Sequence, residues 1–189
     1  MRIIFLTILA ILSFSISAQT KMEKEYRVKQ DKVPENAQKW IIQNFPEAKK
    51  VKWYQEISNG KTTFEAKLQW NKTPYSVEFD SVGTIEDVEM TIDFEEIELT
   101  TRKTIEQYFL GNYKKHKVLK VQKQFTGNLS QFRQYLENPN QTGITTNYEV
   151  EFQGITPESN ELYEALFNQS GQLIQRKTIK TEANINLDF

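Results

Sequence analysis

The feature that most constrains this fold is a sequence frame that occurs twice. Residues 75–85 read YSVEFDSVGTI and residues 163–173 read YEALFNQSGQL, so both follow the pattern Y-x-x-x-F-x-x-x-G-x-[IL]. Up to the phenylalanine, apolar side chains recur at every second position, which is the period of a half-buried strand. The polar residues and the glycine that follow are typical of a tight turn. Each frame therefore predicts a β-hairpin, and its recurrence predicts a duplicated unit.

An amphipathic helix is predicted upstream of each hairpin. In residues 33–45 (VPENAQKWIIQNF) the apolar side chains fall on one stripe at helical spacing, and Pro34 stands near the first turn, where its missing N–H matters little. Residues 99–113 (LTTRKTIEQYFLGNY) carry a similar stripe. Each hairpin is thus preceded by one helix that can cover an apolar sheet face.

Two further strands are predicted between each helix and its hairpin. They are residues 51–57 and 64–69 in the first copy, and 118–125 and 148–153 in the second. A short turn joins the first pair, whereas a long polar loop, residues 126–146, joins the second pair. Consecutive short strands joined by turns indicate antiparallel pairing. The sequence therefore predicts an α+β fold of two tandem helix-plus-four-stranded antiparallel sheet units, residues 30–97 and 98–183, with the helices packed on one sheet face.

The two faces of the predicted sheets differ in polarity. The apolar face is aromatic-rich and is interpreted as core beneath the helices. No predicted element remains to cover the opposite face, so we expect it to be open to solvent. It would carry Lys52, Tyr54, Glu65, Lys67, Gln69, Glu78, Lys120, Gln122, Glu149, Glu151 and Glu164. Within this set, the residues predicted to bind a partner are Lys52, Tyr54, Lys67, Glu78, Glu149 and Glu151.

The motif residues of the first unit resemble those of a known family. Residues 33–48 (VPENAQKWIIQNFPEA) follow V-P-x-x-[AV]-x-x-x-[IW]-x-x-x-F-P-x-A, and the hairpin adds Tyr75, Val77, Phe79, Asp80 and Gly83. These patterns look like the PepSY-like, or β-lactamase-inhibitor-protein-like, domains of exported bacterial proteins. The resemblance covers residues 33–92 closely and residues 99–180 more loosely, because the second helix lacks the Val-Pro start and the Phe-Pro end. It implies tandem units whose sheets form a concave surface, an envelope or secreted location, protein binding by several relatives and no known catalysis.

The chain begins with the pattern of a secretory signal peptide. Arg2 supplies a positive charge, residues 3–14 are apolar, and residues 15–18 (SISA) offer a cleavage site. Residues 1–18 are therefore predicted to be removed, which leaves an N-terminal segment (19–29), the two units and a C-terminal tail (184–189). The apolar run is too short to span a membrane, and no other run approaches that length. We expect a periplasmic, secreted or cell-surface protein.

Composition excludes several kinds of chemistry. The chain has no cysteine, one histidine and a formal net charge of −1. Thiol nucleophiles, disulfides and thiolate metal sites are therefore excluded, and nucleic acid, which needs a strong positive field, is not an expected partner. His116 is interpreted as a solvated loop residue between a helix and a strand. No catalytic residue, cofactor or metal ligand is predicted.

Two segments admit more than one interpretation. The acidic segment 85–99 interleaves carboxylates with apolar residues, which favours a solvated strand face leading into a linker over a metal site. The loop 126–146 carries Phe132, Arg133 and Tyr135, and aromatic residues with arginine are typical of interface anchors. The alternative is that Phe132 and Leu136 fold back onto the sheet edge as a short amphipathic turn.

Three function classes follow from these patterns. The favoured one is an exported, non-catalytic module that uses the polar sheet face to bind an envelope or extracellular protein, either as a general protein–protein interaction or as an inhibitor. The first alternative is a carrier of a small ligand (a peptide, glycan or lipid) in the groove between the repeats. A hydrolase with a site assembled across the sheet is the least favoured. No pattern in the sequence assigns the partner or the oligomeric state.

Overall fold

The computed structural model describes residues 19–21, 24–58, 60–130, 132–139 and 143–179. The predicted signal peptide (1–18) and the predicted C-terminal tail (184–189) lie outside these residues. The first half of the described chain contains β1 (Gln19–Lys21), β2 (Lys24–Val28), η1 (Gln30–Lys32), α1 (Glu35–Asn44), β3 (Lys49–Ser58), β4 (Lys61–Trp70), β5 (Thr73–Asp80) and β6 (Ile85–Thr91). The second half contains η2 (Phe94–Glu96), α2 (Leu99–Asn112), β7 (Lys115–Gly127), α3 (Phe132–Glu137), β8 (Ile144–Ile155), β9 (Asn160–Asn168) and β10 (Leu173–Ile179).

Within the described residues, the strands form one ten-stranded sheet of order β1-β10-β9-β8-β7-β6-β5-β4-β3-β2. Strands β2 to β10 run antiparallel to their neighbours, and β1 pairs in parallel with β10. The two predicted units meet where β6 pairs with β7, with Val88 opposite Phe125 and Glu89 opposite Gln124. The sheet is therefore continuous across the predicted boundary, and the halves are joined by strand pairing rather than separated by a groove.

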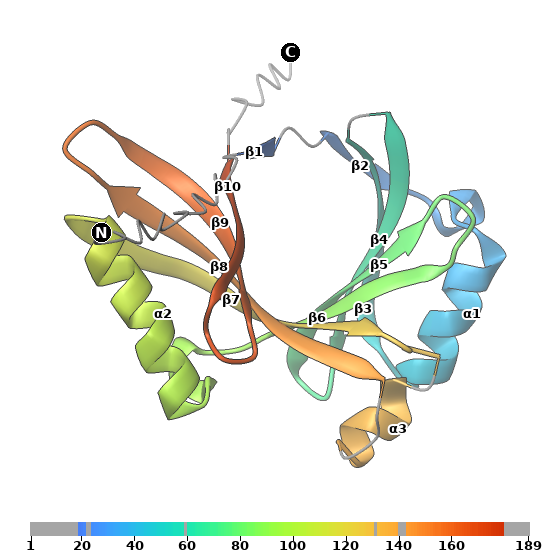
Figure 1. Cartoon of the computed structure of the whole chain (residues 1–189). Coiled ribbons are helices and arrows are strands. Elements are labelled where there is room, and N and C mark those ends of the chain that lie inside the picture. Colours follow the sequence, from blue (N-terminus) through green and yellow to red (C-terminus); the bar gives the residue numbers. More distant parts are fainter. Residues whose placement is uncertain (1–18, 22–23, 59, 131, 140–142, 180–189) are drawn as a thin grey trace, which may run out of the picture.

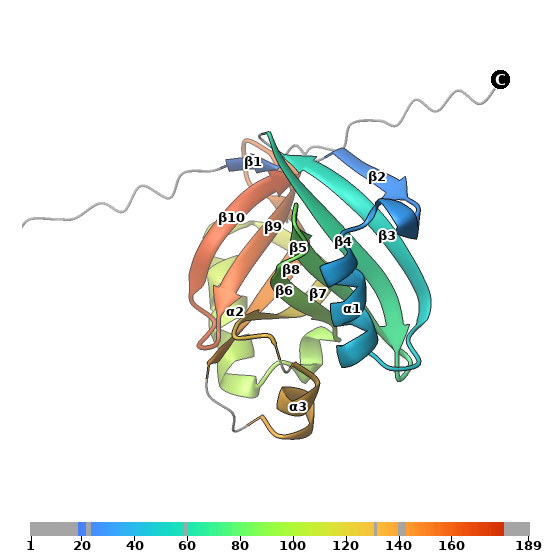
Figure 2. The ribbon, with the colours of Figure 1, turned by 90° about the vertical axis from the view of Figure 1, so that its right-hand side faces the viewer.

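The sheet is strongly curved, and helices α1 and α2 both lie on its outer face (Figure 1). The view in Figure 2 shows α1 over the strands of the first half. Among the described residues, no helix lies on the opposite, concave face, which we call the inner face (Figure 1). The predicted α+β architecture, with antiparallel strands and helices on one sheet face, is confirmed.

Each long helix covers its own part of the core. Ala37 and Ile41 of α1 pack in a cluster with core residues of β3 to β6, such as Val77. Ile105 and Phe109 of α2 pack in a second cluster with core residues of β7 to β9. The first cluster also takes in three residues from the second half, Phe125, Leu129 and Phe132. The two halves thus share hydrophobic packing at their junction as well as backbone pairing.

The two hairpins that share the repeated frame have similar turns. In the first, the Asp80 carboxylate accepts hydrogen bonds from the backbone N–H groups of Val82 (3.0 Å) and Thr84 (2.7 Å). In the second, the Asn168 side-chain oxygen accepts bonds from the N–H groups of Ser170 and Gln172, both 3.0 Å. A short acceptor side chain at the end of the first strand therefore holds each turn closed, as such residues commonly do.

Two segments contain structure that the sequence did not predict. In the segment 19–29, predicted only as an N-terminal segment, residues 19–21 and 24–28 supply strands to both ends of the sheet: β1 pairs with β10, and β2 pairs with β3. The loop 126–146 is shorter than expected because β7 extends to Gly127 and β8 begins at Ile144, and it contains α3. Extended pairing and a short helix therefore replace most of the expected irregular loop.

Candidate functional site

The strand register gathers polar side chains on the inner face. Glu65 on β4 lies opposite Glu78 on β5, and Glu78 lies opposite Asp87 on β6. Three carboxylates on adjacent strands thus form a row across the middle of the sheet. Like charges directly opposite one another destabilise a sheet, but Lys67 Nζ lies 3.1 Å from Glu65 Oε2 and Gln124 Nε2 donates a hydrogen bond to Asp87 Oδ2 at 3.1 Å.

Glu89 lies next to this row on β6, between Ser76 of β5 and Gln124 of β7. Strand register assigns its side chain to the inner face, yet the residue is only 7% exposed. Its backbone pairs with both neighbouring strands, but within the described residues the Glu89 side chain makes neither a hydrogen bond nor an ion pair. A buried ionisable group without a partner is unfavourable, which makes Glu89 the most unusual residue of this surface.

The electrostatic environment of Glu89 disfavours its negative charge. Burial raises the pKa of the Glu89 carboxyl well above its ordinary value, and the negative charges of Glu149, Asp87 and Glu78 raise it further. The ammonium of Lys120 acts in the opposite direction but is the weakest of these influences. The folded protein therefore binds a proton at Glu89 more tightly than the unfolded chain does.

This raised pKa predicts how stability changes with pH. The stabilisation from a proton on Glu89 is fully present below the ordinary glutamate pKa of about 4.3 and is lost as the pH rises through the folded-state value. Glu89→Gln removes this dependence, so we expect the variant to be more stable than the wild type at about pH 8 and the difference to shrink near pH 4. Denaturant unfolding at a series of pH values measures both curves. A variant that is less stable than the wild type at pH 8 would show instead that the ionised carboxylate is stabilised in the fold.

The acids on either side of this centre have cations of their own. On the β7–β10 side, Lys120 Nζ lies 3.2 Å from Glu151 Oε1, and Lys177 Nζ lies 3.5 Å from Glu164 Oε1. On the β2–β4 side, Lys67 makes two such pairs. Lysine side chains of the inner face itself therefore pair with several of its carboxylates.

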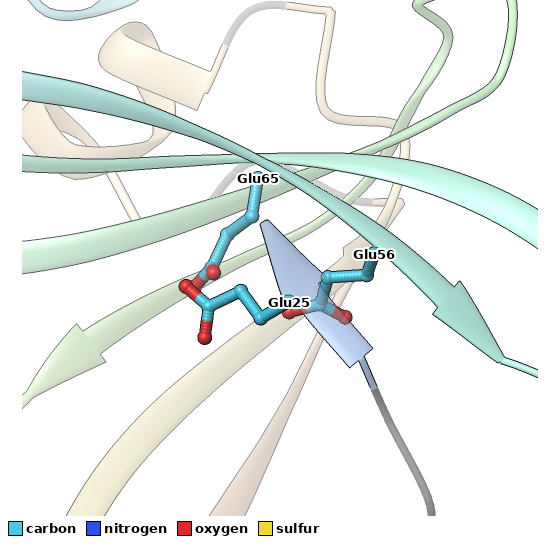
Figure 3. Close-up of side chains that lie close together, drawn as sticks. All are labelled: Glu25, Glu56 and Glu65. Atoms are coloured by element: carbon cyan, nitrogen blue, oxygen red, sulfur yellow. The ribbon is translucent and has the colours of Figure 1, made fainter. Parts of the chain in front are cut away.

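Three glutamates on the β2–β4 side form a close group. Glu25, Glu56 and Glu65 each place a carboxylate oxygen within 4.8 Å of the others (Figure 3). Oxygen ligands so arranged can bind Ca²⁺. However, Lys67 Nζ already lies 2.8 Å from Glu25 Oε1 and 3.1 Å from Glu65 Oε2. The side chain of Lys67 therefore supplies the positive charge that this group requires.

The electrostatics of Lys67 agree with this role. Burial alone would lower the pKa of Lys67, but hydrogen bonds to Glu25 and attraction to Glu65 raise it well above the ordinary value. The ammonium also lies 4.7 Å from the centre of the Tyr54 ring, within cation–π range. Lys67 is thus a structural cation of the inner face.

Removing this cation is expected to destabilise the fold. Lys67→Met leaves three carboxylates close together, and we expect it to lower the free energy of unfolding by about 1–2 kcal/mol at pH 7, less than for a fully buried pair because Lys67 is half-exposed. The loss should shrink at about pH 4, where protonation relieves the repulsion. Lys52→Met, which removes an exposed lysine of β3, is the matched control and should change stability by less than about 0.5 kcal/mol. Equal effects of both variants in urea unfolding would contradict this role.

The structure divides the predicted partner-binding residues into two groups. Strand register places Lys52, Tyr54, Lys67, Glu78, Glu149 and Glu151 together on the inner face. Phe132, Arg133 and Tyr135 belong to α3, which packs on the outer-face core with α1. The loop residues therefore do not extend the polar surface, and partner binding by the first group stays a prediction.

For Phe132 the fold-back alternative holds, and the interpretation as an interface anchor is wrong. Its side chain is completely buried, with its ring centre 5.1 Å from that of Phe125 and 6.3 Å from that of Trp40. Arg133 is exposed and pairs with Glu137 at 3.3 Å. Tyr135 is half-buried. Hydrophobic burial, rather than display to a partner, explains the aromatic content of this segment.

Two other expectations are corrected. His116 lies within β7 rather than in a loop, and its ring stacks on Phe109 with 4.8 Å between centres. The carboxylate of Glu89 was expected on a solvated face but is buried. The alternation of Asp87 and Glu89 with Val88 and Met90 identifies their shared face in the sequence. The burial of Glu89 is a property of the folded sheet, which no local sequence pattern reports.

The described part of the chain forms a curved antiparallel sheet with helices on one face, the architecture of β-lactamase-inhibitor-protein-like (BLIP-like) proteins. A BLIP-like protein from Bacteroides fragilis matches with a TM-score of 0.52 and 15% identity, over 80% of this chain and 90% of that chain. A DUF2874 family protein from Bacteroides ovatus matches with a TM-score of 0.55 and 14% identity, over 77% and 87% of the two chains. A Bacteroides eggerthii protein described as periplasmic has a TM-score of 0.53 and 13% identity, over 77% and 88%. At these identities the likeness establishes the BLIP-like fold.

Two further comparisons and a search for membrane spans complete these findings. A scan against protein-family models and a search of curated proteins found no match. None of the helices in the described ranges combines the length and apolar character needed to cross a membrane.

Proposed function

We propose that this protein is an exported, non-catalytic module that binds another protein through the inner face of its sheet. The observation that carries the proposal is that the helices cover one face of the sheet. Helices α1 and α2 both lie on the outer face, while in the described part of the chain no helix lies over the polar inner face (Figure 1). A curved sheet of this kind offers a wide concave surface, suited to a convex part of a partner rather than to a small molecule.

The likeness to other proteins supports the location and class in this proposal. One similar structure is called BLIP-like and another is described as periplasmic. Residues 1–18 have the pattern of a signal peptide, and residues 33–48 carry the PepSY-like motif. The proposal therefore includes export to the periplasm or cell surface and a distant kinship with PepSY-like domains, built from two tandem units.

Site-specific photocrosslinking tests the binding surface. A benzophenone amino acid at Tyr54, on the inner face, is expected to capture a protein from the cell envelope under irradiation. The matched control is the same amino acid at Leu110, which is 73% exposed on α2 of the outer face. Capture from Leu110 with the same products and yield, or no capture from Tyr54, would contradict binding through the inner face.

A further inference from the structure

We propose that a gap in the edge of the sheet, at the end of β2, binds an extended acidic segment of the partner protein. We call it the edge gap and define it by the residues that line it, 27–30 and 51–53. This inference rests on the proposed function, because strand register places two of these residues, Arg27 and Lys52, on the inner face.

The edge gap exists because β3 extends past the edge strand beside it. Strand register pairs Val28, the last residue of β2, with Trp53 of β3. Residues 49–52 of β3 therefore have no strand next to them on the β2 side within the described residues. Figure 2 shows β3 running beyond the end of β2. The space that remains is an open cavity of about 470 Å³.

This part of β3 can accept an added strand. On the β2 side, the backbone N–H and C=O groups of residues 49–52 have no strand partner in the described part of the chain. An exposed strand edge of this kind pairs readily with an extended peptide, which gains main-chain hydrogen bonds from it. The geometry therefore favours an extended occupant that continues the line of β2.

The charged side chains that line the edge gap are all cations. They are Arg27, Lys29 and Lys52, and within the described residues none of the three makes an ion pair or a side-chain hydrogen bond. A second cavity, of about 280 Å³, shares Lys52 and adds Lys50 and Lys67. Neither cavity has an acidic residue among the described residues that line it. This local excess of positive charge favours a negatively charged occupant.

An acidic peptide segment fits both features of the edge gap. Side chains alternate between the two faces of a strand, so carboxylates at every second position of an added strand would lie on the inner face with Arg27 and Lys52. A free phosphate or a lipid headgroup would use the cations but leave the strand edge unpaired. The combination of an open edge with unpaired cations therefore favours an acidic segment of a protein.

A displayed random-peptide library tests this proposal with the purified protein. We expect the selected peptides to be enriched in aspartate or glutamate. One selected peptide, made again with asparagine or glutamine at its acidic positions, should bind at least about tenfold more weakly in calorimetry. Methylation of its backbone nitrogen atoms, one at a time, should weaken binding at alternate positions, because a strand directs successive N–H groups to opposite edges.

A pair of matched double variants tests the location of the site. Lys29→Gln/Lys52→Gln should weaken binding of the original peptide at least about tenfold, with folding of the variant checked by circular dichroism. Lys103→Gln/Lys114→Gln removes the same charge from two exposed lysines of the second half and should change the affinity by less than about twofold. Equal weakening by both variants would show a general effect of net charge and would overturn the proposal.

Three other results would also overturn the proposal. They are failure to select any peptide, selection of peptides without acidic residues, and backbone methylation without an alternating effect. If phosphatidylglycerol vesicles bind the wild type but not Lys29→Gln/Lys52→Gln, and no acidic peptide is selected, the edge gap binds anionic lipid instead. If the crosslink from Tyr54 persists in these cases, the proposed function stands and only the acidic segment is rejected.

Discussion

Gly83→Ala and Gly171→Ala are each expected to lower the free energy of unfolding by about 2–4 kcal/mol. Both glycines have positive φ angles, +85° and +81°, where a Cβ atom is strained. Both also lie against the first turn of a helix. A Cβ atom at Gly83 would stand 2.8 Å from Pro34 Cβ, and one at Gly171 would stand 2.5 Å from the carbonyl oxygen of Thr101. Strain and overlap therefore act together at these two positions.

Gly60 supplies the control for this prediction. It has a similar φ of +77°, but an added Cβ atom would meet nothing within 4 Å. Gly60→Ala should therefore lose only about 1 kcal/mol, the contribution of backbone strain. Urea unfolding of the three variants measures the difference directly. If all three variants lost the same free energy, the contact between turn and helix would contribute nothing.

This contact also gives a physical reason for the repeated sequence frame. In both halves the hairpin turn packs against the helix that covers the same half: Gly83 against Pro34 and Ala37 of the α1 start, and Gly171 against Thr101 and Thr104 of α2. In the second half, the Thr101 hydroxyl also donates a hydrogen bond to the Gln169 carbonyl oxygen at 2.8 Å. The frame therefore encodes a docking point between turn and helix as well as a hairpin.

The sequence predicted the parts of the fold that depend on local periodicity. The helices expected at residues 33–45 and 99–113 are α1 and α2, and the hairpin strands fall where the alternation placed them. Pairing between distant segments was not accessible in the same way. Residues 19–21 and 24–28 form strands by pairing with the edges of β10 and β3. Pairing of this kind depends on the edge strands that the rest of the sheet presents, and not on the sequence of the segment alone.

The sequence predicted which residues share the polar face, but not how deeply each is buried or which charges lie near one another. Alternation along β4, β5 and β8 assigned Lys67, Glu78 and Glu149 to the polar face, and register confirms that they share it. The burial of Glu89 and its proximity to acids of β5, β6 and β8 are three-dimensional features. The role of Lys67 likewise depends on Glu25, which only β2 brings near. The pairing of charged side chains across the folded sheet could not be predicted from residues that are adjacent in the sequence.

Phe132→Ala is expected to lower the free energy of unfolding by about 3–5 kcal/mol, because it removes a completely buried ring. The ring packs against Phe125 of β7 and against Phe45 and Trp40 of the α1 region, so its loss opens a cavity where the two halves share a core. The backbone N–H of Arg133 also donates to Asn44 Oδ1 at 3.1 Å, which ties α3 to the end of α1. The effect should therefore extend to α1.

Arg133→Ala is the matched control, since it changes the adjacent residue of the same helix. Its side chain is exposed and makes one pair with Glu137, so the variant should lose less than about 0.5 kcal/mol. Thermal and urea unfolding give the free energies, and amide hydrogen exchange should show faster exchange in α1 for Phe132→Ala alone. A small loss for Phe132→Ala together with weaker crosslinking from Tyr54 would reverse the assignment, because it would make the ring a contact for the partner instead of a part of the core.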